Sequence, residues 1–434
     1  MPTEAQLIFS IRPAARLRAL VALGAIATAA AALPALAAPA ITVPEGFTAK
    51  LVHEGVGPAR HIATGPDGTL YVALRKETNG GGTAVLRDTT GDGNYDQTQY
   101  AATPAGTGIL MHDGHLYRSS NDAVYRYDIK PDGMPDIGSR VTMVSLLPDL
   151  GSHAAKPIDI EGDRLFVNVG APSNACQSPR RTKGAAGQSP CPELQESGGI
   201  WSFDATTPDR LFPVDAIREG YGLRHCVAIA VRDRESQLYA VMHGRDQLDS
   251  LWPEHYTAED NANNPAEEFH RINGGRDYGW PYTYWDPQRN ERMLAPEYGG
   301  NGTTSTADPS FTAPIQSFPA HWAPNGMLFY ESEHFPKRYR GGAFVAHHGS
   351  WNRAPFPQAG YKVTFTPFAG DGGNSAPSGD WEPFATGFPG SPEIRSPRDA
   401  EARPMGLAVD IDGTLLIADS VKGRIWRISH EGNE

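Results

Sequence analysis

The chain has 434 residues, with 38 basic and 50 acidic side chains and a formal net charge of −12. Apolar residues make up 39% of it and charged residues 20%, which is enough for a large core and argues against a disordered or collagen-like chain. An acidic chain without a dense basic stretch is also a poor nucleic-acid binder, because phosphate contacts need a basic surface. The 47 glycines and 37 prolines indicate many short strands joined by turns.

The first 37 residues have the three parts of a secretory signal peptide. Arg12, Arg16 and Arg18 precede an uncharged run, 19–33, and small residues around Ala37 offer a cleavage site. The alternative, a transmembrane anchor, needs about 20 apolar residues, and this run is shorter. We expect cleavage near residue 37, a periplasmic or secreted location and no membrane span, with residues 38–434 forming a single domain.

Six phrases along the rest of the chain have the pattern of a β-hairpin. Each joins an alternating apolar run to a second apolar run through a polar turn, usually Asp-Gly. They are His61–Leu74, Gly108–Ser119, Ile158–Gly170, Ala228–Gly244, Met327–Gly349 and Gly406–Asp419. A hairpin with one or two further strands makes a propeller blade. The pattern predicts an all-β protein, a six-bladed β-propeller with long loop insertions at 172–198 and 245–323. A β-sandwich with generic hairpins is the alternative.

One acidic loop, Asp88–Asp96, partly matches a calcium loop. Oxygen-bearing residues recur at every second position and Gly93 lies at the turn, but Gln99 stands at the twelfth position in place of Glu. The alternative is an Asp/Gly-rich hairpin tip.

Three cysteines fit an oxidising compartment. Cys176 and Cys191 lie 15 residues apart in a polar loop, where a disulfide would stabilise the fold by about 3 kcal/mol. The chain contains no CxxC or CxxCH spacing, which would have indicated a metal site or a covalently bound haem. Cys226 lies in an apolar run, and we expect it to be a buried free thiol.

Four segments carry side chains suited to chemistry. His153 precedes the third hairpin, Arg224 and His225 precede the fourth, and Arg403 precedes the sixth. The segment 346–353, AHHGSWNR, places His348 at the end of the fifth and Arg353 just after it. A structural hydrogen bond for His153 and a surface ion pair for Arg224 are the alternatives. A cation at the mouth of the central channel would instead suit an anionic cofactor.

These segments resemble the glucose/sorbosone dehydrogenase family, soluble six-bladed propellers that use pyrroloquinoline quinone (PQQ) and calcium. The matching phrases, within about residues 150–430, are YGLRHCVAIAV, MHGRDQLDSLWP, NPAEEFHRINGGRDYGWPY, PNGMLFY, GGAFVAHHGSWNR and RPMGLAVDIDGTLLIAD. GRDYGWP and HGSWNR are the most specific, and they fit the sorbosone dehydrogenase branch best.

The resemblance implies a role for each site residue. His153 matches the general base that takes the substrate hydroxyl proton while hydride passes to the quinone. Arg224 matches the arginine that lies against the cofactor, and His225 stands where the glucose enzyme has Asn. Two consecutive backbone carbonyls that hold Ca²⁺ map to Gly244 and Arg245.

The last blade departs from the family pattern. Where the glucose enzyme has two arginines, this chain has Arg403 and Met405. We expect Arg353 and His348 to supply the missing positive charge.

The resemblance therefore implies an exported quinoprotein that oxidises a sugar or a related alcohol or aldehyde. Its electrons would pass to an acceptor, a quinone or a small cytochrome. The alternative is a propeller without the cofactor, either a calcium-dependent lactonase-type hydrolase or a carbohydrate-binding module. A hydrolase would need carboxylates around a metal, whereas these segments are rich in Arg and His.

Overall fold

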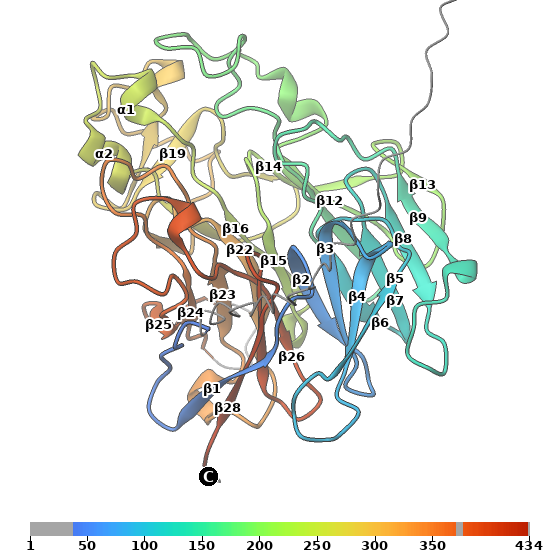
Figure 1. Ribbon diagram of the computed structural model, residues 1–434. Coiled ribbons are helices and arrows are strands. Elements are labelled where there is room, and N and C mark those ends of the chain that lie inside the picture. Colours follow the sequence, from blue (N-terminus) through green and yellow to red (C-terminus); the bar gives the residue numbers. More distant parts are fainter. Residues whose placement is uncertain (1–37, 370–375, 433–434) are drawn as a thin grey trace, which may run out of the picture. The chain divides into compact units, whose positions relative to one another are not determined.

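The computed structural model describes residues 38–369 and 376–432, and its strands group into six blades (Figure 1). The predicted leader, residues 1–37, lies outside the described residues. Each of the six predicted hairpins forms the first two strands of a blade, which confirms the six-bladed propeller.

The four main strands of each of the first three blades lie between Ala59 and Tyr221. Blades 2 and 3 each gain one short strand that pairs parallel to their outermost strand. Blade 1 contains β2 (Ala59–Thr64), β3 (Leu70–Thr78), β4 (Gly81–Arg87) and β5 (Gln97–Ala101). Blade 2 contains β6 (Ile109–His112), β7 (His115–Ser119), β8 (Val124–Asp128) and β9 (Val141–Ser145), with β13 (Arg210–Leu211) parallel to β9. Blade 3 contains β10 (Ile158–Glu161), β11 (Arg164–Val169), β12 (Gly199–Asp204) and β14 (Ile217–Tyr221), with β18 (Arg276–Asp277) parallel to β14.

The last three blades complete the circle. Blade 4 contains β15 (Ala228–Arg232), β16 (Gln237–Met242), β17 (Glu267–Arg271) and β21 (Gln316–Phe318). Blade 5 contains β22 (Pro324–Phe329), β23 (Ala343–His347), β24 (Lys362–Thr366) and β25 (Glu382–Ala385). Blade 6 contains β26 (Pro404–Val409), β27 (Leu415–Asp419), β28 (Ile425–His430) and, from the other end of the described chain, β1 (Phe47–His53).

The first strands of the blades form a closed ring around the channel. Each contacts the first strand of the next blade, from β2 through β6, β10, β15 and β22 to β26, and β26 contacts β2. Because these strands run in the same direction, their N-terminal ends meet at one end of the channel, together with the C-terminal ends of the antiparallel second strands.

Burial along the strands follows their place in the blade. All five residues of β27 are buried, since neighbouring blades cover both of its faces. In the outer strand β5, exposed and half-buried residues alternate, as expected for a strand with one face in water. The Asp-Gly turns work as predicted: Asp113 and Gly114 have φ of 47° and 77°, the left-handed geometry of a tight hairpin turn.

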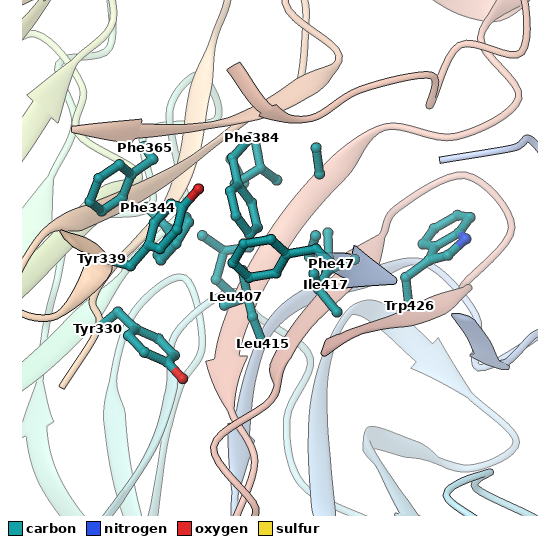
Figure 2. Packing of buried hydrophobic residues seen from close by; sticks show 14 of the residues in the cluster. Phe47, Tyr330, Tyr339, Phe344, Phe365, Phe384, Leu407, Leu415, Ile417 and Trp426 are labelled. Carbon is teal, nitrogen blue, oxygen red and sulfur yellow. The ribbon is translucent and has the colours of Figure 1, made fainter. Parts of the chain in front are cut away.

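Blade 6 is closed by the N-terminal strand of the described chain. β1 pairs antiparallel with β28, Phe47 opposite His430. Figure 2 shows Phe47 within the aromatic cluster between blades 5 and 6, where its ring meets that of Phe335 edge-on at 4.8 Å and that of Phe384 at 5.1 Å. Such pairs add to the free energy gained by burying the rings.

The two predicted insertions carry the remaining helices and strands, but the second, 245–323, is not one continuous insertion, because it also contains β17 and β21 of blade 4 and β18 of blade 3. The first contains the predicted disulfide between Cys176 and Cys191, and Cys226 is a buried free thiol, as expected. The second contains α1 (Leu248–Leu251), α2 (Ala258–Asn263) and the hairpin β19 (Thr283–Asp286)–β20 (Glu291–Leu294). Six short 3-10 helices lie in the described loops: η1 (Ile137–Ser139), η2 (Pro192–Gln195), η3 (Asp233–Glu235), η4 (Pro296–Tyr298), η5 (Lys337–Tyr339) and η6 (Pro397–Asp399). Across 38–369 and 376–432, no helix is long and apolar enough to cross a membrane.

The acidic loop Asp88–Asp96 joins β4 to β5 as a hairpin tip. The two carboxylate oxygens of Asp88 accept hydrogen bonds of 2.7 Å from the backbone N–H groups of Gly91 and Gly93. This carboxylate therefore stabilises the turn itself.

Candidate functional site

His153 lies in the loop that leads into β10, with a left-handed φ of 53°. Its Nδ1 lies 2.5 Å from the carbonyl oxygen of Ala171, at the C-terminal side of β11. The imidazole stacks on that of His225, with ring centres 4.6 Å apart and planes inclined by 22°. Burial, and next the nearby Arg224, lower the pKa of His153, so its ring is neutral around neutral pH.

Gly170 allows this stacking. A β-carbon at Gly170 would lie 2.5 Å from Nδ1 of His225 and 2.7 Å from Cβ of His153. Only a residue without a side chain leaves room for both imidazoles.

His225 is 6% exposed, and its Nδ1 is buried without a hydrogen-bond partner. On its other side lies His243, whose ring meets it edge-on at 5.2 Å. His243 is held by Nε2, 2.8 Å from the carbonyl oxygen of Pro324. Burial, followed by the neighbouring His153, holds the pKa of His225 well below its usual range. An unpaired buried nitrogen is costly, and this one lies against Gly170.

Arg224 is 3% exposed and deeply anchored. Its guanidinium donates to the carbonyl oxygen of Asn174 (3.3 Å), the side-chain oxygen of Asn174 (3.1 Å), the carbonyl oxygen of Gly244 (3.0 Å) and Asp246 (3.2 Å). Burial alone would raise the pKa of Asp246, but Arg224 and then Arg181 lower it. The structure thus joins Arg224 to Gly244 through an ion-paired network next to the imidazoles.

Gly244 and Arg245 follow β16. The N–H of Gly244 donates to Glu267 at 2.9 Å, and the buried Arg245 side chain pairs with Glu297. Within the described residues, no group of three or more His, Cys, Asp or Glu side chains is placed to hold a metal. A cation here would therefore be held mainly by backbone oxygens.

Arg403, His348 and Arg60 form a second group, contributed by blades 6, 5 and 1. Arg403 donates to the carbonyl oxygens of His348 (2.9 Å) and Gly349 (2.6 Å). His348 is bonded through Nε2 to Ser420 Oγ at 2.7 Å. Burial is the main cause that lowers the pKa of Arg60 to about 10, and the positive charges of Arg75 and Arg403 lower it further.

Arg60 also lies beside Met405, the residue that stands where the glucose enzyme has its second arginine. Its Nη1 lies 3.6 Å from Sδ of Met405, and its Nε donates to Thr107 at 3.1 Å. Blade 1 thus supplies a guanidinium next to Met405.

Arg353, by contrast, donates to the carbonyl oxygens of Ala262 and Pro357. These hydrogen bonds, and that of its backbone N–H to Gln358, do not join Arg353 to any of the other predicted site residues within the described parts of the chain.

A pocket of about 370 Å³ opens over this end of the channel. Its lining comes from blades 1 to 4: Arg60, Arg75, Gly106, Thr107, Asn121, Gly151, His153, Ala154, Ala155 and His225. The volume is ordinary for a small-molecule site. The lining residues include two arginines and two histidines but no carboxylate, so the pocket favours an anionic ligand beside a neutral imidazole.

Arg60, Arg75 and His243 were not predicted from the sequence. Arg60 precedes the first hairpin just as Arg224 and Arg403 precede theirs, so applying the same positional rule to all six hairpins would have found it. Arg75 lies in the C-terminal half of the second strand β3, and His243 follows the second strand β16. Only the antiparallel pairing brings these ends to the same side as the N-terminal ends of the first strands.

Comparison with known proteins agrees with this architecture. A family model described as TrAA12-like matches residues 41–431. A pyrroloquinoline quinone-dependent pyranose dehydrogenase from Coprinopsis cinerea is 24% identical over 89% of this chain and 54% of its own length. This chain thus spans about half the length of that relative.

Two solved structures share the fold. The holo form of the PQQ domain of the Coprinopsis cinerea pyranose dehydrogenase superposes with a TM-score of 0.70 at 20% identity, covering 90% of this chain and 97% of that domain. A calcium structure of a Trichoderma reesei family AA12 protein superposes with a TM-score of 0.71 at 20% identity, covering 91% and 97%.

Proposed function

The chain belongs to the TrAA12-like family, and from that premise we propose that it is a PQQ-dependent dehydrogenase that oxidises a C–OH group of a sugar. The observation that carries the proposal is the cationic pocket, free of lining carboxylates, that adjoins the neutral imidazole of His153. The relative named for pyranose oxidation supports a pyranose as the substrate class.

The residues of the pocket fit the cofactor. PQQ is a planar tricarboxylate, and Arg60 and Arg75 in the lining offer guanidinium groups that match carboxylates in charge and geometry. The imidazole of His225 also lines the pocket. Arg224 would act mainly by fixing the Gly244 carbonyl, because its own donors already have partners.

When bound, PQQ supplies a two-electron acceptor for hydride. His153 has its Nδ1 proton committed to Ala171, which leaves the Nε2 lone pair free to accept the hydroxyl proton of the sugar. The carbinol hydrogen would leave with its electron pair to bound PQQ as the hydroxyl proton passes to His153, and the sugar would become a carbonyl compound. Two electrons and two protons leave the sugar, one proton through His153.

Calcium binding at Gly244 and Arg245 would depend on the cofactor. Two guanidinium groups, Arg224 and Arg181, pair with the carboxylate of Asp246, and burial raises the pKa of the neighbouring Glu267 to about 7, so the local charge is not negative. A further dication therefore requires the negative charge of bound PQQ. We expect tight calcium binding only with PQQ present, measured by calorimetry with and without the cofactor.

Sorbosone or another aldehyde is a second substrate to test, since the sequence resembles that branch. The electron acceptor, a quinone or a small cytochrome, and export with cleavage near residue 37 are part of the same proposal. Intact-mass measurement of periplasmic material checks the last of these.

The deciding experiment is an absorbance titration of the purified protein with PQQ in the presence of Ca²⁺. Dye reduction across a panel of pyranoses, sorbosone and simple aldehydes would follow. We expect saturable binding and turnover of at least one pyranose. If the protein binds no PQQ, the oxidoreductase proposal is wrong, and a hydrolase or a carbohydrate-binding role becomes the better explanation.

A further inference from the structure

We propose that Lys156 is the positioning residue that holds the His153 loop in its working conformation. This inference rests on the proposed function for its catalytic consequence, but the structural role can be measured separately. Lys156 precedes β10 and is 1% exposed. A lysine is almost never so deeply buried without a specific partner.

The ammonium of Lys156 bonds to both ends of the loop that carries His153. Nζ donates to the carbonyl oxygen of Pro148 at 3.0 Å and to that of Ala154 at 2.8 Å. The segment between these two carbonyls contains His153. The lysine thus closes the loop from inside, as a disulfide or a bound cation would.

The loop needs such a restraint because its conformation is strained. A non-glycine residue with φ of 53°, as in His153, costs of the order of 1 kcal/mol or more and persists only when its surroundings impose it. The Nδ1 contact with Ala171 fixes the ring. Lys156 fixes the backbone on both sides of it.

The backbone of Lys156 also connects the loop to the opposite wall of the pocket. Its carbonyl oxygen accepts a 2.5 Å hydrogen bond from Ser119 Oγ, which in turn accepts the N–H of Gly108 at 2.8 Å. Gly108 follows Thr107, the partner of Arg60. Lys156 therefore connects the loop of His153 to the side of the pocket that carries Arg60.

Burial carries an electrostatic cost that an apolar side chain would avoid. It lowers the pKa of Lys156 to about 8, although Asp149 and Asp122 act to raise it. The positive charge also helps to lower the pKa of His225. A methionine would fill the same space but leave two part-buried carbonyls without this donor, so the lysine fixes the conformation of this loop at some loss of stability.

The test compares Lys156→Met and Lys156→Arg with Lys130→Met, a control that removes an exposed lysine paired with Asp136. Hydrogen–deuterium exchange on the protein without cofactor is the first readout. We expect peptides covering 147–155 to exchange at least 10-fold faster in Lys156→Met, less so in Lys156→Arg, and as in the wild type in Lys130→Met. Unchanged exchange in 147–155, or equally faster exchange in all blades, would overturn the proposal.

The second readout separates positioning from cofactor binding. With a substrate on which the wild type works, Lys156→Met should lower kcat by about 10- to 100-fold while the Kd for PQQ stays within threefold, with partial recovery in Lys156→Arg. A matching loss of PQQ affinity would contradict the proposal. Should the wild type bind no quinone, the proposed function fails, and the exchange experiment still decides the role of Lys156.

Discussion

His153 uses one ring nitrogen for position and leaves the other for chemistry. Because Nδ1 lies against the carbonyl of Ala171, the ring is held as the tautomer with a proton on Nδ1 and a lone pair on Nε2. A base that is neutral well below pH 6.5 stays available over a broad pH range, and burial is the main reason for it.

We expect His153→Gln to lower kcat by about 10²–10⁴-fold, the usual contribution of general acid–base catalysis, with little change in PQQ affinity. Arg60→Ala should instead weaken PQQ binding by about 10- to 100-fold, since a charge-assisted hydrogen bond contributes about 1.5–3 kcal/mol. Absorbance titrations and steady-state rates distinguish the two. Excess PQQ should restore activity to Arg60→Ala only, and recovery of His153→Gln would show that its role has been misassigned.

Gly170 gives a test of the imidazole pair that leaves both histidines in place. The added methyl group of Gly170→Ala would overlap both His225 and His153, so the rings must separate. We expect kcat to fall at least 10-fold with a modest loss of stability. Gly274→Ala is the control, because the nearest atom to its new β-carbon lies at 3.7 Å. Equal rates for the two variants would mean that the stacked arrangement does not matter.

At the scale of elements, the loop closed by the disulfide is part of the site. Arg181, inside the loop, donates to Asp246 at 2.9 Å, and Asn174, just before it, bonds both Asp246 and Arg224. The disulfide-closed loop thus fixes the position of the Asp246 carboxylate, which in turn pairs with Arg224.

Replacing both cysteines, Cys176→Ser with Cys191→Ser, should therefore have two effects. Thermal unfolding should reveal a loss of up to about 3 kcal/mol, the value expected for a loop of this length. PQQ affinity should also fall by about three- to tenfold as Asp246 loses its support. Arg181→Ala, which keeps the disulfide, should reproduce part of the second effect alone. Full PQQ affinity in the double variant would show that the loop acts on stability only.

At this scale, the features that could be predicted from the sequence are those whose contacts are local in the chain. The hairpins depend on local patterns, an apolar alternation and a turn such as Asp113-Gly114, and all six were found from the sequence. The contact between Arg60 and Met405 joins residues 345 apart in the chain, and ring closure alone brings them together. The burial of Lys156 likewise could not be predicted from the neighbouring sequence, because a single lysine before a strand is usually exposed to solvent.

At the scale of the whole molecule, buried histidines should set the acid limit of stability. Eight described histidines have a pKa lowered chiefly by burial: His61, His153, His225, His243, His270, His321, His347 and His348. Below pH 6.5 these histidines take up protons in the unfolded chain but stay neutral in the folded protein. The stability that is present above that pH is therefore lost as the pH falls. Buried carboxyl groups such as Asp159 and Glu267, whose pKa burial raises to about 7, act in the opposite direction but are fewer.

We expect the free energy of unfolding to fall by at least about 2 kcal/mol between pH 7 and pH 5, since each proton taken up contributes about 1.4 kcal/mol per pH unit. Urea unfolding followed by tryptophan fluorescence at several pH values measures this. Stability that is constant or higher at pH 5 would contradict it.

The pairing of β1 with β28 has a consequence for the order in which the molecule assembles. Thr48 and Ser429 share a hydrogen bond across 381 residues, so the first described strand stays without its neighbour until the final strand has been made. Closing so long a loop is slow, and an unpaired strand edge invites association with other chains in the meantime. A chain that stops before Ile425 would leave this edge open permanently. Synthesis through β28 is therefore the step that commits the protein to a closed ring.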